Sequence, residues 1–275
     1  MQTSISKLAI IAGSGSLPIE ICNSCIARQI DYIVIAIEGN ADLKKYDNKP
    51  CYTVALGQIG KLLEVLEKQS VSHIILAGGV RKPDFSSLRV DVKGAILFAK
   101  LVAAKLLGDN YILTEVLRYL ESYNYNIIGV KDYFSELLVP FGNLTDDHPH
   151  KQDILDIEIG KNAAAALGSL DIGQAVIVEN KVILALEAAE GTDNLIKRST
   201  ELKFSSKRSG VLVKIVKPYQ DLRVDLPTIG PETIRNIADA NLSGIAISAN
   251  HAIIVDKNLT LELAKKYGLF ISGIE

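Results

Sequence analysis

Reactive side chains are most concentrated in the stretch K-P-Y-Q-D-L-R-V-D-L-P-T-I-G, residues 217–230. It carries two cations, two carboxylates and a hydroxyl, namely Lys217, Arg223, Asp221, Asp225 and Thr228. Pro218 and Pro227 each fix φ at about −65° and push the preceding residue towards extended geometry, so the stretch reads as a strand or a rigid loop. The residues that follow, P-E-T-I-R-N-I-A, predict a helix that begins close to Asp225 and Thr228. A helix N-terminus beside such groups suits an anion, a metal ion or both, although a surface turn with solvated charges is also compatible with these residues alone.

Two further polar motifs stand at predicted junctions between helices and strands. E-G-T-D supplies Glu190, Thr192 and Asp193. Thr192 and Asp193 could simply cap the next helix, whereas the carboxylates of Glu190 and Asp193 could instead ligate a hard cation, with Thr192 as a candidate for substrate binding. D-I-G-Q supplies Asp171 and Gln174, for which ordinary turn chemistry is the alternative to ligand binding.

Glycine loops follow two predicted strands in the first half of the chain. The loop G-S-G-S-L-P contains Gly13, Ser14 and Gly15, and Glu38 ends the next strand about where a ribose-binding acid would stand. Pro18 replaces the third glycine of the dinucleotide fingerprint, which leaves anion or sugar binding, dinucleotide binding and a plain turn as alternatives. The loop G-G-V-R-K-P adds Gly79 and two cations, Arg81 and Lys82, where a solvated basic turn is the alternative to a phosphate site.

The elements that must position these groups alternate between apolar strands and helices. Residues 7–12, 32–37 and 73–77 predict strands separated by helices, the pattern of an open parallel sheet. Residues 140–151 lack apolar periodicity, and beyond them a predicted hairpin precedes further strands and helices. We therefore predict an α/β protein with a Rossmann-like domain over residues 1–140. A second α/β domain, with a mixed sheet and the catalytic motifs, is predicted over residues 141–275.

Composition excludes several classes of protein. The 275 residues are 48% hydrophobic, and 30 basic against 32 acidic residues give a formal charge of −2 without runs of like charge, which argues against a nucleic-acid surface. No apolar run approaches the ~18 residues of a spanning helix, and the apolar run near the N-terminus is too short for a signal peptide. Three cysteines fit a reducing compartment better than a disulfide framework, so we expect a cytoplasmic protein.

The candidate groups together favour phosphate chemistry. Oxygen ligands without a Cys or His pattern indicate Mg²⁺ or Mn²⁺ in preference to zinc, and glycine loops with Arg and Lys indicate a phosphate. These are the parts of a site in which a metal ion assists the attack of water on a phosphoryl group.

The ordered motifs G-S-G-S-L-P, R-K-P-D-F, L-D-I-G-Q, E-A-A-E-G-T-D and K-P-Y-Q-D-L-R-V-D-L-P-T-I-G resemble the UDP-2,3-diacylglucosamine pyrophosphatases of the LpxI type over nearly the whole chain. The resemblance implies a divalent-metal-dependent hydrolase of Gram-negative lipid A biosynthesis. Such an enzyme converts UDP-2,3-diacylglucosamine to 2,3-diacylglucosamine 1-phosphate and UMP, by attack of water on the sugar-side phosphate. It also implies a homodimer whose two domains clasp the substrate.

Residue roles follow from the same resemblance. The family's essential aspartate falls on Asp225, which would hold the metal or activate water, with Asp193 and Glu190 as further metal ligands. Thr228, Lys217 and Arg223 would meet diphosphate oxygens. Two acyl chains imply an apolar cleft between the domains and a peripheral contact with the inner membrane. Ser14 and Ser16 stand where many relatives carry a glycine-richer loop, which leaves the ligand of that loop open.

Two interpretations from other classes remain compatible with the sequence. One is an oxidoreductase that binds a nicotinamide nucleotide through Gly13, Gly15 and Glu38. The other is a sensor that binds a nucleotide sugar without catalysis.

Overall fold

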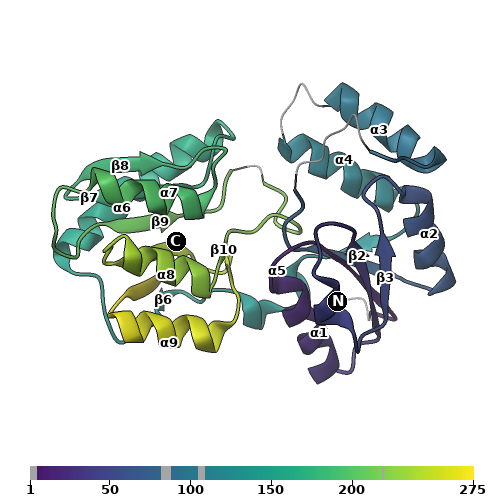
Figure 1. Ribbon diagram of the computed structural model, residues 1–275, viewed down its shortest axis with the longest axis horizontal. Coiled ribbons are helices and arrows are strands. Elements are labelled where there is room, and N and C mark those ends of the chain that lie inside the picture. Colours follow the sequence, from purple (N-terminus) through teal and green to yellow (C-terminus); the bar gives the residue numbers. More distant parts are fainter. Residues whose placement is uncertain (1–4, 82–87, 105–108, 219) are drawn as a thin grey trace. The chain divides into compact units, whose positions relative to one another are not determined.

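The computed structural model describes residues 5–81, 88–104, 109–218 and 220–275 (Figure 1). The chain divides into two compact units, Met1–Phe134 and Ser135–Glu275. The domain boundary predicted from the sequence, between residues 140 and 141, lies just after the division between Phe134 and Ser135.

The described part of the N-terminal unit contains a five-stranded sheet of order β3-β2-β1-β4-β5, and every adjacent pair of its strands is parallel. Its strands are β1 (Leu8–Ala12), β2 (Tyr32–Ile37), β3 (Cys51–Val54), β4 (His73–Ala77) and β5 (Asn126–Ile127). All five residues of β1 are buried, as expected for a strand that is covered on both faces. The predicted Rossmann-like open parallel sheet is confirmed.

Helices connect these strands and cover the sheet. They are α1 (Leu17–Ala27), η1 (Leu43–Tyr46), α2 (Ile59–Lys68), α3 (Val92–Ala104), α4 (Asp109–Glu121) and α5 (Val130–Tyr133). Asp91 fixes the start of α2, because its carboxylate accepts hydrogen bonds from the N–H groups of Gly60 (2.7 Å) and Lys61 (3.2 Å). The same carboxylate accepts the N–H of Gly94 at 2.7 Å, which ties α3 to α2.

The C-terminal unit is built on a six-stranded sheet of order β6-β13-β11-β9-β7-β8 in its described residues. The strands β9 (Val211–Lys214), β11 (Gly244–Ser248) and β13 (Phe270–Ile274) run parallel, whereas β6 (Gly142–Asn143), β7 (Ala175–Glu179) and β8 (Val182–Leu186) pair antiparallel. The predicted mixed sheet is confirmed. A separate parallel pair joins β10 (Thr228–Ile229) to β12 (Ile253–Ile254).

Helices cover both faces of this sheet, and alternate strand residues face opposite sides. Ile177 and Leu212 pack with residues of α7 (Thr192–Ser199), α8 (Pro231–Asp239) and α9 (Lys257–Tyr267). Their chain neighbours Val178 and Val213 belong to clusters that include residues of α6 (Lys151–Ser169). The short helices η3 (Ser135–Leu137) and η4 (Thr200–Leu202) complete the unit. The alternation of strand residues between the two groups of helices is the period of two of a β-strand, and here both faces of the strands are buried.

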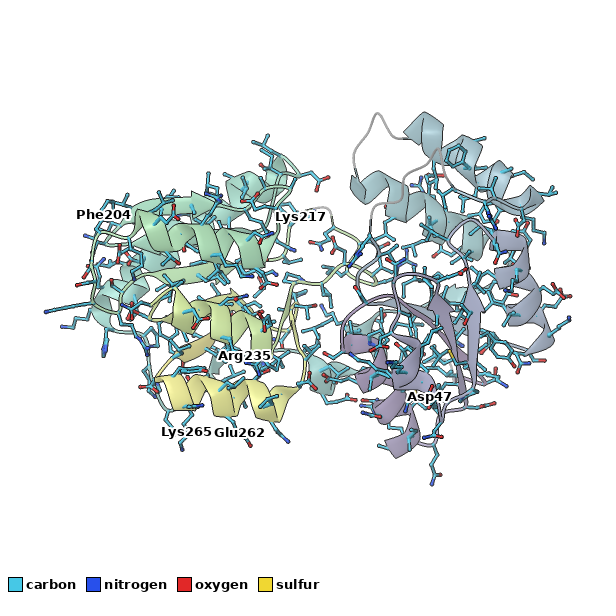
Figure 2. All side chains as sticks on the ribbon, in the orientation of Figure 1. Asp47, Phe204, Lys217, Arg235, Glu262 and Lys265 are labelled. Carbon is cyan, nitrogen blue, oxygen red and sulfur yellow. The ribbon has the colours of Figure 1, made fainter. Side chains whose placement is uncertain are left out.

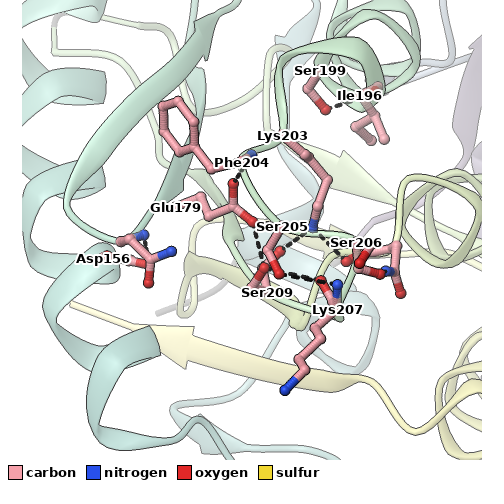
Figure 3. A network of polar contacts seen from close by, with 12 residues as sticks. Asp156, Glu179, Ile196, Ser199, Lys203, Phe204, Ser205, Ser206, Lys207 and Ser209 are labelled. Carbon is pink, nitrogen blue, oxygen red and sulfur yellow. Dashed lines mark hydrogen bonds and ion pairs between the residues drawn. The ribbon is translucent and has the colours of Figure 1, made fainter.

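A buried polar network fixes one end of the C-terminal unit (Figure 3). Glu179, at the end of β7, is fully buried and accepts hydrogen bonds from the Phe204 N–H (2.8 Å) and the Ser209 hydroxyl. The Lys203 ammonium lies 3.4 Å from the same carboxylate and donates to the carbonyl of Asn241 at 2.7 Å. Because Phe204 and Lys217 lie at opposite ends of this unit, the network is remote from the reactive stretch (Figure 2). We assign it to stability, since a buried carboxylate needs its partners.

None of the helices in the described segments combines the length and hydrophobicity needed to cross a bilayer.

Candidate active site

Strand directions bring three of the predicted motifs to one edge of the C-terminal sheet. Lys214, the last residue of β9, pairs with Ala175, the first residue of β7. Since β7 and β8 are antiparallel, the end of β8 at Leu186 lies beside the start of β7. D-I-G-Q directly precedes β7, E-G-T-D follows β8, and residues 217–230 follow β9. All three motifs therefore lie at the same end of these strands.

The contact between D-I-G-Q and the end of β8 is unusually close. A Cβ atom on Gly173 would lie 2.3 Å from the carbonyl oxygen of Glu187, so only glycine fits there. The Gln174 N–H donates to the Glu187 carboxylate at 2.9 Å. The side-chain oxygen of Gln174 is buried and has no hydrogen-bond partner among the described residues. A polar atom buried in this way is available to a ligand.

Lys214 is the centre of a buried polar chain at this edge. The residue is 7% exposed, and its ammonium donates to the Thr192 hydroxyl at 3.0 Å and to the Thr228 carbonyl at 3.4 Å. Thr192 in turn donates to the Glu187 carboxylate at 2.6 Å. Side-chain contacts from Lys214 thus join β9, the end of β8, the start of α7 and β10.

Burial lowers the pKa of Lys214, and the carboxylates of Glu187, Asp193 and Asp225 lie close enough to oppose that shift. A buried ammonium with acidic neighbours is stable only where such partners offset its desolvation. Two of the predicted functional carboxylates, Asp193 and Asp225, are therefore in the electrostatic field of one cation.

Asp225 occupies a partly buried position in the loop between β9 and β10. Burial raises the pKa of its carboxyl group, while the charges of Lys217 and Lys214 and a hydrogen bond from Gln220 act in the opposite direction. The Gln220 amide also donates to the Asp225 carbonyl, which fixes the local backbone. A carboxyl group with a raised pKa, held among cations, has the character of a general base.

The remaining cations of the stretch are paired with carboxylates. The Lys217 ammonium lies 2.8 Å from Asp171, so an ion pair links the stretch to D-I-G-Q. Arg223 donates through two nitrogens to the Asp221 carboxylate, and these hydrogen bonds hold the pKa of Asp221 below its usual value. Thr228 donates its hydroxyl to the Leu226 carbonyl at 3.1 Å.

The two carboxylates of E-G-T-D have different partners. Glu190 lies 2.8 Å from the Arg198 guanidinium, whose hydrogen bonds lower the pKa of Glu190. Asp193 accepts a hydrogen bond of 2.9 Å from Asn236 of α8. Within the described residues, no group of three or more His, Cys, Asp or Glu side chains is arranged to hold a metal ion. Among the described residues, Glu190, Asp193 and Asp225 therefore do not form one set of three metal ligands.

The glycine loops of the N-terminal unit pack against each other. The Ser14 N–H donates to the Gly79 carbonyl at 2.8 Å and the Gly79 N–H donates back to Ser14 at 3.1 Å. The Gly13 N–H is donated to the Ala77 carbonyl at 2.8 Å, whereas Gly15 has a positive φ of 96°. Their contacts join the two loops at the carboxyl edge of the parallel sheet, where ligands of such sheets bind.

The second loop carries two cations, Arg81 and Lys82. Arg81 is exposed, and its N–H donates to the Asn40 side chain at 2.8 Å. Lys82 lies outside the residues that the structure describes.

Four residues of this edge were not among the predicted site residues: Glu187, Lys214, Gln220 and Asn236. Lys214 carried a signal, because it is the one charged residue within the apolar run V-L-V-K-I-V, residues 211–216. A charged side chain in a buried strand requires partners, and here the Thr192 hydroxyl and the Thr228 carbonyl accept hydrogen bonds from the Lys214 ammonium. Gln220 and Asn236 had no comparable signal in the sequence.

Comparison with known proteins places the whole chain in one family. A family model described as the LpxI N-terminal domain matches residues 7–137, and one described as the LpxI C-terminal domain matches residues 140–272. The chain is also 35% identical over 274 residues to the UDP-2,3-diacylglucosamine pyrophosphatase LpxI of Caulobacter vibrioides, a match that covers 98% of each chain. The resemblance seen in the motifs is confirmed, and the chain belongs to the LpxI family.

Proposed function

We propose that this chain hydrolyses the diphosphate of UDP-2,3-diacylglucosamine to 2,3-diacylglucosamine 1-phosphate and UMP, a step of lipid A biosynthesis. The full-length match to a UDP-2,3-diacylglucosamine pyrophosphatase supports the reaction. The site assignment rests on Asp225, which is partly buried at this edge of the sheet. The charges of Lys217 and Lys214 lower the pKa of its carboxyl group against the effect of burial.

Asp225 is the catalytic residue in this proposal. Its carboxylate accepts a proton from the attacking water as the water oxygen bonds to the sugar-side phosphorus. The bond between that phosphorus and the bridging oxygen breaks, and the bridging oxygen leaves with UMP. The sugar phosphate therefore gains its new oxygen from water.

Cations and loop groups hold the diphosphate. Lys217, Arg223 and Thr228 are the candidates in the reactive stretch, where Lys217 would exchange Asp171 for a phosphate oxygen. Gln174 offers its unpartnered buried oxygen to a donor of the nucleotide. The N-terminal candidates are Gly13, Ser14, Gly15, Gly79, Arg81 and Lys82, for which the carboxyl edge of a parallel sheet is the expected ligand position.

The site suits a divalent metal ion of the hard class. Mg²⁺ is usually bound through one or two carboxylates together with waters and substrate phosphates, so a cage of three protein ligands is not required. Asp225 and Asp193 would hold it, because both carboxylates lie close enough to Lys214 to affect its pKa and so belong to the same part of the site. When bound, Mg²⁺ or Mn²⁺ would offset phosphate charge and make the bound water more acidic. Glu190 could join them only by leaving Arg198.

Substitutions at Asp193 and Glu190 should distinguish the proposed metal ligand, Asp193, from Glu190, which is paired with Arg198. Asp193→Asn is expected to weaken Mn²⁺ binding, measured by electron paramagnetic resonance, by about 10-fold or more, a typical cost of disturbing a metal site. Glu190→Gln should change Mn²⁺ affinity by a smaller factor, since Glu190 already has a partner. Equal losses in the two variants would place Glu190 among the ligands and contradict this division.

Release of UMP tests the proposed reaction. The full chain is incubated with UDP-2,3-diacylglucosamine and Mg²⁺, and UMP is measured by chromatography. UMP formed in proportion to enzyme supports the proposal. Substrate that binds without release of UMP would instead identify a nucleotide-sugar sensor, and protection from heat by NAD(P) without UMP release would favour an oxidoreductase.

We further propose a cytoplasmic homodimer that contacts the inner membrane at its periphery. Helix α3 supports the membrane contact, because Val92 and Ile96 are 81% and 51% exposed about one turn apart. Sedimentation with anionic phospholipid vesicles measures the contact, and analytical ultracentrifugation measures the dimer. Protein that remains in the supernatant, or that sediments as a monomer, would refute the respective part.

A further inference from the structure

Glu187 is a buried carboxylate at the same edge of the C-terminal sheet as Asp225. It directly follows β8 and is 6% exposed. Its N–H donates to the Ala175 carbonyl at 2.9 Å, and its own carbonyl oxygen lies so close to Gly173 that a Cβ atom on Gly173 would be 2.3 Å away. These two backbone contacts fix Glu187 against the start of β7.

Both carboxylate oxygens of Glu187 accept hydrogen bonds. One accepts the Gln174 N–H at 2.9 Å, and the other accepts the Thr192 hydroxyl at 2.6 Å. The Thr192 oxygen accepts in turn from the Lys214 ammonium at 3.0 Å. Since a hydroxyl has one proton to donate, Thr192 gives it to Glu187 and presents a lone pair to Lys214. This hydroxyl therefore links the two charged groups.

The buried ammonium of Lys214 needs a negative partner that stays with it during the reaction. Burial lowers the pKa of Lys214, and among the carboxylates that oppose this shift Glu187 has the largest effect, followed by Asp193 and Asp225. In the proposed function Asp193 and Asp225 hold a divalent cation, whose charge would repel that of Lys214. Glu187 is the carboxylate of these three that is not a proposed metal ligand.

We propose that Glu187 is a positioning residue of the reaction, which holds the Lys214 ammonium in place through the Thr192 hydroxyl. The proposal rests on the proposed function for the reaction that it affects. It also assigns Thr192 to this chain of contacts in place of the substrate, because the hydroxyl proton already has an acceptor. Glu187 acts on the reacting groups through Lys214.

Replacing Glu187 with Gln removes the charge and keeps the length of the side chain. An amide has one acceptor oxygen in place of two, so it cannot accept from both Gln174 and Thr192 in the same way. Glu187→Gln should lower kcat for UMP release by about 10-fold or more, the usual cost of losing a group that orients a site. Glu262→Gln is the matched control and should keep wild-type kcat, because Glu262 is exposed on α9 (Figure 2).

A comparison of stability with turnover separates positioning from a purely structural role. In metal-free buffer, Glu187→Gln and Lys214→Met should each lower the Tm, because each leaves a buried charge with less compensation. The double variant should lose less Tm than the sum of the two single losses, while its kcat stays at or below that of the slower single variant. A Glu187 with only a structural role would lower the Tm and leave the kcat of the folded enzyme unchanged.

Thr192→Val is a second test, in which both charges remain and only the hydroxyl link is lost. It should lower kcat with little change in KM, and it decides the question if Glu187→Gln does not fold. A rise in KM alone would assign Thr192 to the substrate and contradict the proposal. Wild-type kcat in folded Glu187→Gln, or additive losses of Tm, would also overturn it. If the wild-type protein released no UMP, the proposed function would fail, whereas the Tm values would still test the pairing of Glu187 with Lys214.

Discussion

Replacing Asp225 with Asn is expected to lower kcat for UMP release by at least ~10²-fold, the contribution of a positioned general base. Asn keeps the shape of the side chain and cannot accept a proton from water at neutral pH. The pKa of Asp225 is raised mainly by burial, so its ionised form costs stability in the folded protein. In the absence of added metal, the Asn variant should therefore unfold at the same temperature as the wild type or higher.

The Asp225 experiment requires a folded protein and a carboxylate that takes no part in the reaction. Asp239 serves as the control, because it is exposed at the end of α8. Asp239→Asn should retain wild-type kcat, and circular dichroism should show the same fold for both variants. Turnover close to wild type in Asp225→Asn would remove Asp225 from the catalytic role.

Lys214→Met is expected to lower kcat by about 10²-fold, which is the cost of displacing catalytic groups by roughly 1 Å. Met has a similar length but cannot donate to Thr192 and Thr228, the two partners of the Lys214 ammonium. It also removes the charge that faces Glu187, Asp193 and Asp225. We regard Lys214 as a positioning residue, because it is buried and acts through these groups.

A purely structural role for Lys214 would give a different result. Loss of positioning should reduce kcat and Mn²⁺ affinity together in the folded variant, whereas simple instability would reduce the amount of active enzyme and leave both constants unchanged. Lys197→Met is the control, since Lys197 is an exposed lysine of α7. A folded Lys214→Met protein with wild-type kcat and Mn²⁺ affinity would contradict the assignment.

The architecture was largely predictable because buried parallel strands have a strong local signal. Runs such as L-A-I-I-A and Y-I-V-I-A-I are apolar at almost every position, and the structure places both in the centre of the sheet. The hairpin β7–β8 and helix α8 were predicted for similar reasons, from an apolar pair around a turn and from a proline at the start of a helix.

Strand β3 was missed, and its position explains why. C-Y-T-V is short and lies at the edge of the sheet, where it pairs with β2 alone. Three of its four residues are only partly buried, so the sequence lacks the continuous apolar run that marks a central strand. Its parallel pairing with Val34–Ile37 is a tertiary contact that local pattern does not encode.

The candidate site was predictable as a set of motifs, but the pairing of its side chains was not. Lys217 and Asp171 form an ion pair across 46 residues of sequence, and Asn236 reaches Asp193 across 43. These contacts depend on the strand order of the C-terminal sheet, which places the start of β7 beside the end of β9. The family resemblance predicted Asp225 as the catalytic residue, whereas the position of Lys214 near Glu187, Asp193 and Asp225 became apparent only from the fold.

Hydrolysis in water enriched with oxygen-18 tests the proposed reaction at its reacting atoms, because one mass spectrum of the products reports both the cleavage and the phosphorus that is attacked. Wild-type enzyme is incubated with UDP-2,3-diacylglucosamine and Mg²⁺ in labelled water. We expect one labelled oxygen in 2,3-diacylglucosamine 1-phosphate and none in UMP, with both products at least ~10²-fold slower to appear with Asp225→Asn. Label in UMP, or an intact diphosphate after incubation with the wild-type protein, would contradict it.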